Sequence, residues 1–262
     1  MRVLEQLGLG ARWYRESLRT VRVQPLYFTS VVVFYAMMMG LLGMIPWIGI
    51  VIAGLFWPYG TIMIAEAGRD SLLGRRPSLA PLSRAMRNPS TRLRLIRVGI
   101  LYSIAVVTTA AVWQLLGEDE ISKWEIQNDR IVWDSALQHI PYGAIVAAAA
   151  IYIPSILAMW FTPLLVYLKN MTIGKAVFYS FTGCLTNLLA VVWALTLAFG
   201  TFLAVTVGSS LALGLAGLSS VAIYVLLPVA LLGTAVIYGT YYPMWRSVFS
   251  EVADTPEGNP RA

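Results

Sequence analysis

The chain has 262 residues, of which 58% are hydrophobic and only 12% charged, and its mean hydropathy is +0.70. Soluble domains carry charge on about a quarter of their residues, so this composition excludes a soluble protein and indicates a chain that folds in lipid. The single Cys184 excludes an internal disulfide and a cysteine-based metal cage, and the single His139 excludes a histidine-rich metal site. The net charge of +6 follows the predicted topology and forms no patch typical of nucleic-acid binding.

Six apolar runs are long enough to cross a hydrocarbon core of about 30 Å at 1.5 Å per residue. They predict spans at about residues 26–44, 46–65, 93–116, 140–167, 188–207 and 218–242. The spans and their short connectors use most of the chain, so we expect one all-α, polytopic membrane domain over residues 1–250. Prolines inside the predicted spans should bend them, because proline removes a backbone hydrogen bond: Pro58, Pro154 and Pro163.

An amphipathic helix is expected before the first span. Its apolar stripe consists of Leu4, Leu7, Ala11, Tyr14, Leu18 and Val21. A second stripe with the same spacing consists of Arg12, Arg15, Arg19 and Arg22. This pattern is typical of a helix in the headgroup layer, with its arginines on lipid phosphates. A helix docked on the rest of the protein is the alternative, and the two are compatible.

The most basic part of the chain, residues 68–97, follows the second predicted span. We expect a short amphipathic helix there that ends at Asn88-Pro89, and we predict four further contacts with lipid headgroups, from Arg84, Arg87, Arg92 and Arg94. Glu66 and Arg69 stand just before and inside this segment, three residues apart. That spacing on a helix predicts a local ion pair rather than a functional carboxylate.

Residues 117–139 have the opposite charge, with six acidic and two basic residues. Trp124, Ile126, Ile131 and Trp133 around Asn128-Asp129 fit a small hairpin, and a short helix from residue 129 to 138 fits almost as well. The acidic residues lack the spacing of a calcium loop. We therefore interpret the segment as a solvated acidic loop.

The distribution of charge predicts the orientation. Seventeen of the 19 basic residues fall at the N-terminus, in residues 68–97, between Lys169 and Lys175, or near the C-terminus. By the positive-inside rule both termini are then cytoplasmic, and the acidic loop 117–139 faces the periplasm. The polar tail, residues 251–262, is expected to be disordered in the cytoplasm.

The chain contains a weak internal repeat. Gln24-Pro25, Asn88-Pro89 and Asn187-Leu188 each separate a short amphipathic helix from an odd-numbered span. The sequence thus predicts three tandem units, each an interfacial helix followed by a helical hairpin. Because each unit crosses the membrane twice, the repeats are parallel rather than inverted, and they fit a bundle with pseudo-threefold symmetry.

Three segments carry a resemblance to a known family: residues 158–164 (AMWFTPL) with Ser180 and Asn187 downstream, the loop Arg69-Asp70…Gly74-Arg75-Arg76-Pro77, and Trp13…Pro25. They resemble an uncharacterised proteobacterial family of six-span inner-membrane proteins. More remotely, the chain is similar to the membrane domain attached to some bacterial glycerophosphodiester phosphodiesterases, whose enzymatic domain it lacks. The resemblance implies the fold and a bacterial inner-membrane location, and it implies no catalytic residue.

Two functions remain open. We expect a non-enzymatic scaffold, assembly factor or partner-binding protein without cofactor, because the sequence has no phosphate-binding glycine loop, nucleophile elbow or metal-ligand cluster. The expected partners are anionic lipids and a membrane protein or a second copy of the chain, not nucleic acid. The alternative is a permease for a lipid or small amphiphile. It would use a cavity between the three hairpins that proline kinks open and small residues of spans four to six line.

Overall fold

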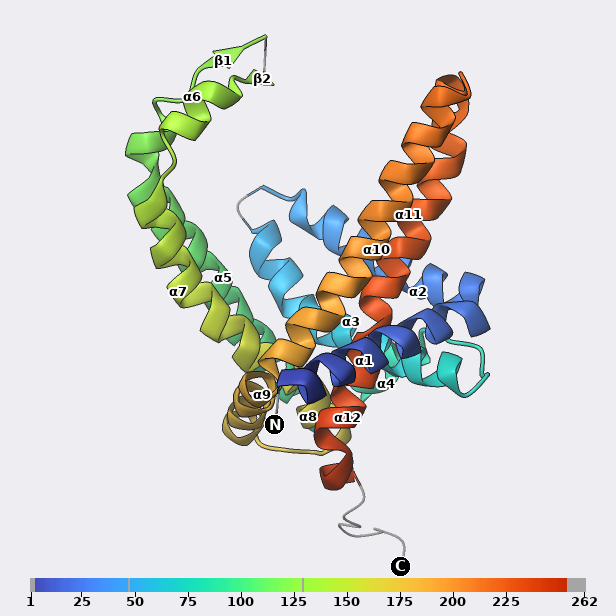
Figure 1. Ribbon diagram of the computed structural model, residues 1–262. Helices are drawn as coiled ribbons and strands as arrows, with labels where there is room; N and C mark the ends of the chain where they lie inside the picture. The colour runs from blue at the N-terminus through green and yellow to red at the C-terminus, as the bar shows by residue number, and fades with distance from the viewer. Residues whose placement is uncertain (1–2, 47, 129, 254–262) are drawn as a thin grey trace, which may run out of the picture.

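The computed structural model describes residues 3–46, 48–128 and 130–253 (Figure 1). Within these ranges the protein is almost entirely helical, and its only strands, β1 (Ile126–Gln127) and β2 (Arg130–Ile131), form a small antiparallel pair. Six helical segments are long and apolar enough to cross a membrane. The predicted all-α, polytopic membrane fold is therefore confirmed.

The first unit consists of α1 (Val3–Val23), α2 (Pro25–Gly43) and α3 (Gly49–Leu72). Pro25 occupies the first turn of α2, where its missing N–H leaves no hydrogen bond unmade. Pro58 lies inside α3, which nevertheless continues as one helix to Leu72, beyond the predicted boundary at residue 65. Four residues of this extension are buried where other helices pack against the end of α3: Glu66, Ala67, Gly68 and Ser71.

The second unit consists of α4 (Ala80–Arg87), α5 (Pro89–Ile121), α6 (Trp133–Gln138), α7 (Tyr142–Met159) and α8 (Thr162–Leu168). The side chain of Asn88 caps α5, since its Oδ1 accepts hydrogen bonds from the backbone N–H groups of Ser90 (3.1 Å) and Thr91 (3.3 Å). The region predicted as an acidic loop contains both alternatives, the strand pair and the short helix α6. Its first residues continue α5, and Asp129 lies outside the described residues.

The third unit consists of α9 (Ile173–Thr186), α10 (Leu188–Leu215), the 3₁₀ turn η1 (Ser219–Val221), α11 (Ala222–Gly239) and α12 (Tyr241–Ala253). Helix α10 extends well past the predicted end at residue 207. The chain turns at Gly217, whose φ of +69° suits glycine. The predicted disordered tail begins at residue 251, but α12 includes residues up to Ala253; from residue 254 onward the tail lies outside the described residues.

The three hairpins α2–α3, α5–α7 and α10–α11 are each preceded by an amphipathic helix, as predicted: α1, α4 and α9. Helix α3 packs on α5, and α2 packs on α11. Figure 1 shows α5 and α7 leaning away from α10 and α11, whereas α1, α8, α9 and α12 gather where the hairpins meet. The main hydrophobic core lies at this shared end and draws residues from all three units.

Helix α1 is docked on this core, mainly against α10 and α11. Trp13 is only 1% exposed, and Ser17 Oγ donates a hydrogen bond to the Val236 carbonyl oxygen at 2.8 Å. Gly10 permits the close approach, because a Cβ there would lie 2.5 Å from the backbone oxygen of Ala190. The docked alternative thus holds, while Leu4 and Leu18 from the predicted apolar stripe stay exposed.

Candidate functional site

A cavity of about 590 Å³ lies between the three hairpins. Every hairpin contributes to its wall, which consists of Tyr35, Ala36, Met39, Trp57, Thr61, Ile64, Tyr102, Tyr152, Ile156, Trp160, Leu195, Ile237, Tyr238, Thr240 and Tyr241. Its volume falls within the range of about 300–1,000 Å³ typical of small-molecule sites. The cavity exists only because the hairpins meet, since none of them encloses it alone.

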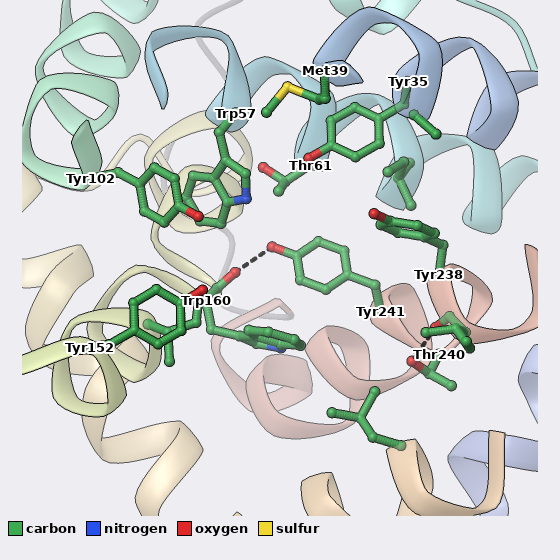
Figure 2. A pocket seen from close by; sticks show the side chains of 15 residues that line it. Tyr35, Met39, Trp57, Thr61, Tyr102, Tyr152, Trp160, Tyr238, Thr240 and Tyr241 are labelled. Atoms are coloured by element: carbon green, nitrogen blue, oxygen red, sulfur yellow. Dashed lines mark hydrogen bonds between the residues drawn. The ribbon is translucent and has the colours of Figure 1, made fainter. Parts of the chain in front are cut away.

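Five tyrosines give the cavity its polar character. Figure 2 shows their hydroxyl groups converging on its centre from different helices: Tyr35 of α2, Tyr102 of α5, Tyr152 of α7, Tyr238 of α11 and Tyr241 of α12. The side chains of Tyr102 and Tyr152 lie on the same side of the cavity (Figure 2). The site therefore combines apolar walls with a central group of neutral hydrogen-bonding side chains.

Aromatic contacts join each pair of hairpins around the cavity. The rings of Trp57 and Tyr102 stack with centroids 4.4 Å apart and join the first hairpin to the second. Tyr35 and Tyr238 meet edge to face at 5.6 Å and join the first to the third. Such ring pairs add about 0.5–1.5 kcal/mol to the free energy gained by burial, so they favour one relative position of the hairpins.

The third pairing depends on a break between α7 and α8. The helix ends at Met159, and the carbonyl oxygen of Trp160 accepts a hydrogen bond from the hydroxyl of Tyr241 (Figure 2). Ser180 of α9 supports the break, because its Oγ accepts from the Phe161 N–H and donates to the Leu157 carbonyl oxygen, both at 2.9 Å. Ser180 is fully buried, so the freed backbone groups have a partner where water is excluded.

The predicted lining of the cavity is wrong. Small side chains of spans four to six were expected there, but Ala144 and Ala148 are buried in α7 at its contact with α5, and Ala190 and Ala194 of α10 face α1. Small residues let helix backbones approach closely. The wider spaces between hairpins are left for aromatic rings.

The eight arginines predicted to bind lipid headgroups all lie outside the cavity lining. Seven of them are exposed in α1, α4 and α5: Arg12, Arg15, Arg19, Arg22, Arg84, Arg87 and Arg92. Arg84 and the half-buried Arg94 make contacts with other segments of the chain. A role in headgroup binding stays a prediction for all eight.

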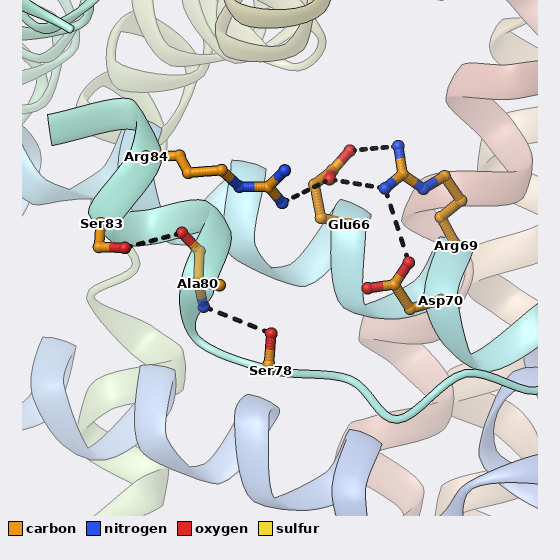
Figure 3. Close-up of polar contacts among 7 residues, drawn as sticks. All are labelled: Glu66, Arg69, Asp70, Ser78, Ala80, Ser83 and Arg84. Atoms are coloured by element: carbon orange, nitrogen blue, oxygen red, sulfur yellow. Dashed lines mark hydrogen bonds and ion pairs between the residues drawn. The ribbon is translucent and has the colours of Figure 1, made fainter. Parts of the chain in front are cut away.

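Arg84 belongs to a cluster around Glu66 (Figure 3). Glu66 is 3% exposed, and its carboxylate lies 2.9 Å from the guanidinium of Arg69, which is the predicted local ion pair. Arg84 of α4 approaches the same carboxylate at 3.5 Å, and Asp70 lies 3.5 Å from Arg69. No sequence pattern indicates the contact with Arg84, because α4 must first fold back onto α3.

Arg94 fastens α5 to the connector between α8 and α9. Its guanidinium donates hydrogen bonds to the side-chain oxygen and, at 3.1 Å, to the backbone oxygen of Asn170. Asn170 has a φ of +52°, a conformation that asparagine tolerates better than most residues. These bonds position the turn at the base of the second hairpin.

Among the described residues, no group of three or more His, Cys, Asp and Glu side chains is placed to hold a metal ion. None of the described residues that line the cavity is charged. Its two threonines bond within their own helices, Thr61 to the Pro58 oxygen at 2.8 Å and Thr240 to the Ile237 oxygen at 2.7 Å. The described wall therefore offers apolar contacts and neutral hydroxyl groups to a molecule inside the cavity.

The chain is similar to a probable inner membrane protein of Burkholderia thailandensis, with 27% identity over 245 residues that cover 92% of this chain and 90% of that protein. No family model and no solved structure matches the chain. The six apolar helices indicate that the chain is a multi-pass membrane protein. Its similarity to the Burkholderia protein extends over nearly its full length.

Proposed function

We propose that this protein is a non-enzymatic inner-membrane protein that takes an amphiphilic molecule from the bilayer into its central cavity, as a permease or carrier. One observation carries the proposal: all three hairpins contribute to one apolar cavity whose polar groups converge at its centre (Figure 2). The similarity to a protein described as a probable inner membrane protein supports the location.

The walls also suggest how binding could be coupled to movement. Each pair of hairpins meets at the cavity through aromatic side chains rather than through charged groups. A ligand that contacts all three hairpins can shift their relative positions only if it binds one arrangement of the hairpins more tightly than another. A passive or ligand-driven exchange with the bilayer fits this wall better than a step coupled to a titrating group, since no Asp, Glu, His, Lys or Arg is among its described residues.

Filling the cavity tests the proposal. Ile156→Trp adds bulk to the wall, whereas Ile153→Trp, on the same helix and 53% exposed, is the matched control. We expect Ile156→Trp to lower the binding of a photoactivatable acyl lipid at least about fivefold and to abolish lipid or solute flux in proteoliposomes, with the control near wild type. The proposal would be contradicted if the photoactivatable lipid labelled both variants equally and the flux through the wild-type protein were no higher than in protein-free liposomes.

Partner binding, as a scaffold or assembly factor, is a second candidate. One observation favours it: the segment between α5 and α7 exposes large apolar side chains outside the spans, Ile126 by 70%, Trp133 by 74% and Leu137 by 64%. We expect Ile126→Ser/Trp133→Ser to lose a protein that copurifies with the wild type in mild detergent. Retention of every copurified protein would contradict this role for the loop.

A further inference from the structure

We infer that the ligand of the central cavity is an uncharged amphiphile with a carbonyl or ether oxygen, and that the Tyr35 hydroxyl donates a hydrogen bond to that oxygen. The inference rests on the proposed function and narrows it to a chemical class. It follows from the position of Tyr35, from the hydroxyl groups around it, and from the absence of charge in the wall.

Tyr35 is held rigidly in place. Its side chain is 6% exposed, and its ring lies against Gly60 of α3, where a Cβ would come within 2.1 Å of the ring atom Cε2. Tyr238 covers another side of the ring, edge to face at 5.6 Å. Glycine at position 60 therefore creates the space for this ring, and the hydroxyl is directed into the cavity (Figure 2).

The Tyr35 hydroxyl forms no hydrogen bond with any other residue that the structure describes, and the same is true of Tyr238. Other hydroxyl groups of the wall do have partners: Tyr241 donates to the Trp160 oxygen, and Thr61 and Thr240 donate to carbonyl oxygens of their own helices. Neither oxygen of Tyr35 and Tyr238 is among the fully buried side-chain atoms that lack a partner, so both hydroxyls are accessible and present donors to whatever enters the cavity.

The wall selects against charge. The 15 described residues that line the cavity are all uncharged, and the buried carboxylate of Glu66 is already paired with Arg69 and Arg84. An ionised headgroup would lose its hydration here without gaining a counter-charge. A neutral oxygen acceptor loses far less, and tyrosine hydroxyls can replace the hydrogen bonds that it made to water.

The remaining wall suits an apolar body. Met39, Ile64, Ile156, Leu195 and Ile237 are aliphatic, and the stacked rings of Trp57 and Tyr102 form a flat aromatic face. This chemistry fits the ester carbonyl of a diacylglycerol or the ring carbonyl of a lipid-soluble quinone. Both share a neutral carbonyl acceptor on an apolar body, and separate probes distinguish them.

The test measures binding to the purified full-length protein in nanodiscs with four probes: radiolabelled dioleoylglycerol, decylbenzoquinone, phosphatidylglycerol and squalene. Tyr35→Phe and Tyr238→Phe remove one oxygen each and keep the rings. The matched controls are Tyr27→Phe on α2 and Tyr224→Phe on α11, which are 45% and 77% exposed. Thermal unfolding of each variant shows that it is folded.

We expect at least one of the two uncharged carbonyl-bearing probes, dioleoylglycerol or decylbenzoquinone, to bind, and Tyr35→Phe to weaken that binding about three- to tenfold, the usual effect of one neutral hydrogen bond. The controls should change it less than about twofold, and squalene, if it binds, should not respond to Tyr35→Phe. The inference is overturned if phosphatidylglycerol binds more tightly than both dioleoylglycerol and decylbenzoquinone, or if Tyr35→Phe has no effect on any probe that binds. Either result leaves the proposed function standing. Failure of all four probes to bind overturns both.

Discussion

Glu66 is a buried carboxylate at the end of α3, and its neighbours decide what it can do. Two guanidinium groups from different helices neutralise it, Arg69 at 2.9 Å and Arg84 at 3.5 Å. The two contacts should contribute differently to the stability of the fold, because the Arg69 side chain is 34% exposed and that of Arg84 is 59% exposed. Solvent weakens the more exposed contact.

Removal of Arg69 should therefore destabilise the protein more than removal of Arg84. We expect Arg69→Ala to cost about 2 kcal/mol, since it leaves a buried charge with a single, more distant partner, and Arg84→Ala to cost about 0.5 kcal/mol. Thermal unfolding in detergent measures both, with exposed Arg87→Ala of the same basic segment as control. An equal loss of stability in Arg69→Ala and Arg84→Ala would contradict the expectation that Arg69 contributes more.

Ser180 is a second residue whose role is set by its surroundings. It satisfies one donor and one acceptor at the break between α7 and α8, and both would be left unpaired in Ser180→Ala. We expect that variant to lose about 1–3 kcal/mol of stability. Thr182→Ala, at a half-buried position of the same helix where the hydroxyl bonds only to the helix's own carbonyl oxygens, should stay within about 0.5 kcal/mol. Matching melting temperatures for the two would refute the account.

At the scale of the element, α1 connects the third unit to the first. Besides its contacts with α10 and α11, it accepts the Ser71 hydroxyl of α3 at the Thr20 carbonyl oxygen (2.5 Å), and Glu16 pairs with Arg246 at 2.8 Å. The helix is thus part of the folded base of the protein. Its exposed arginines remain available on its outer side.

A pair of glycines tests the docking of α1. A methyl group added at Gly10 would lie 2.5 Å from the Ala190 oxygen, whereas one added at Gly8 would have no atom within 4 Å. We expect Gly10→Ala to displace α1 and increase its cleavage by protease. Gly8→Ala should stabilise the helix by about 0.5–1 kcal/mol, because alanine favours helix. Equal resistance of the two variants to protease would show that the contact is unimportant.

The arginines of α1 test its contact with lipid. If Arg12, Arg15, Arg19 and Arg22 bind anionic headgroups, replacing all four with glutamine should lower copurified cardiolipin or phosphatidylglycerol, at about 1 kcal/mol per lost charge near the surface. Lys123→Gln/Arg130→Gln, in the acidic segment, is the control. Unchanged lipid content in the fourfold variant would refute the prediction.

At the scale of the whole molecule, the protein is three helical hairpins joined at one end and separating toward the other (Figure 1). Aromatic contacts close the joined end in pairs: Trp57–Tyr102, Tyr35–Tyr238 and Tyr241 with Trp160. The cavity lies where these contacts meet. A change in any one hairpin therefore reaches the site directly.

The orientation predicted from charge belongs to this scale. Cys184 is fully buried, so it should give little background in cysteine labelling. We expect Gln127→Cys to react with a membrane-impermeant maleimide in cells with a permeabilised outer membrane, and Ser78→Cys to react only after the inner membrane is opened. The reverse labelling pattern would show that the predicted orientation in the membrane is wrong.

The sequence by itself determined the class of fold, because the length of an apolar run and the spacing of charges and prolines are local properties that lipid and water act on directly. The Glu66–Arg69 pair could be predicted for the same reason, since both residues lie on one helix. The tertiary structure decided the docking of α1, the break at Trp160 and the partner of Arg84. It alone brought together tyrosines from five helices, because their convergence depends on how separate hairpins pack, which no local pattern encodes.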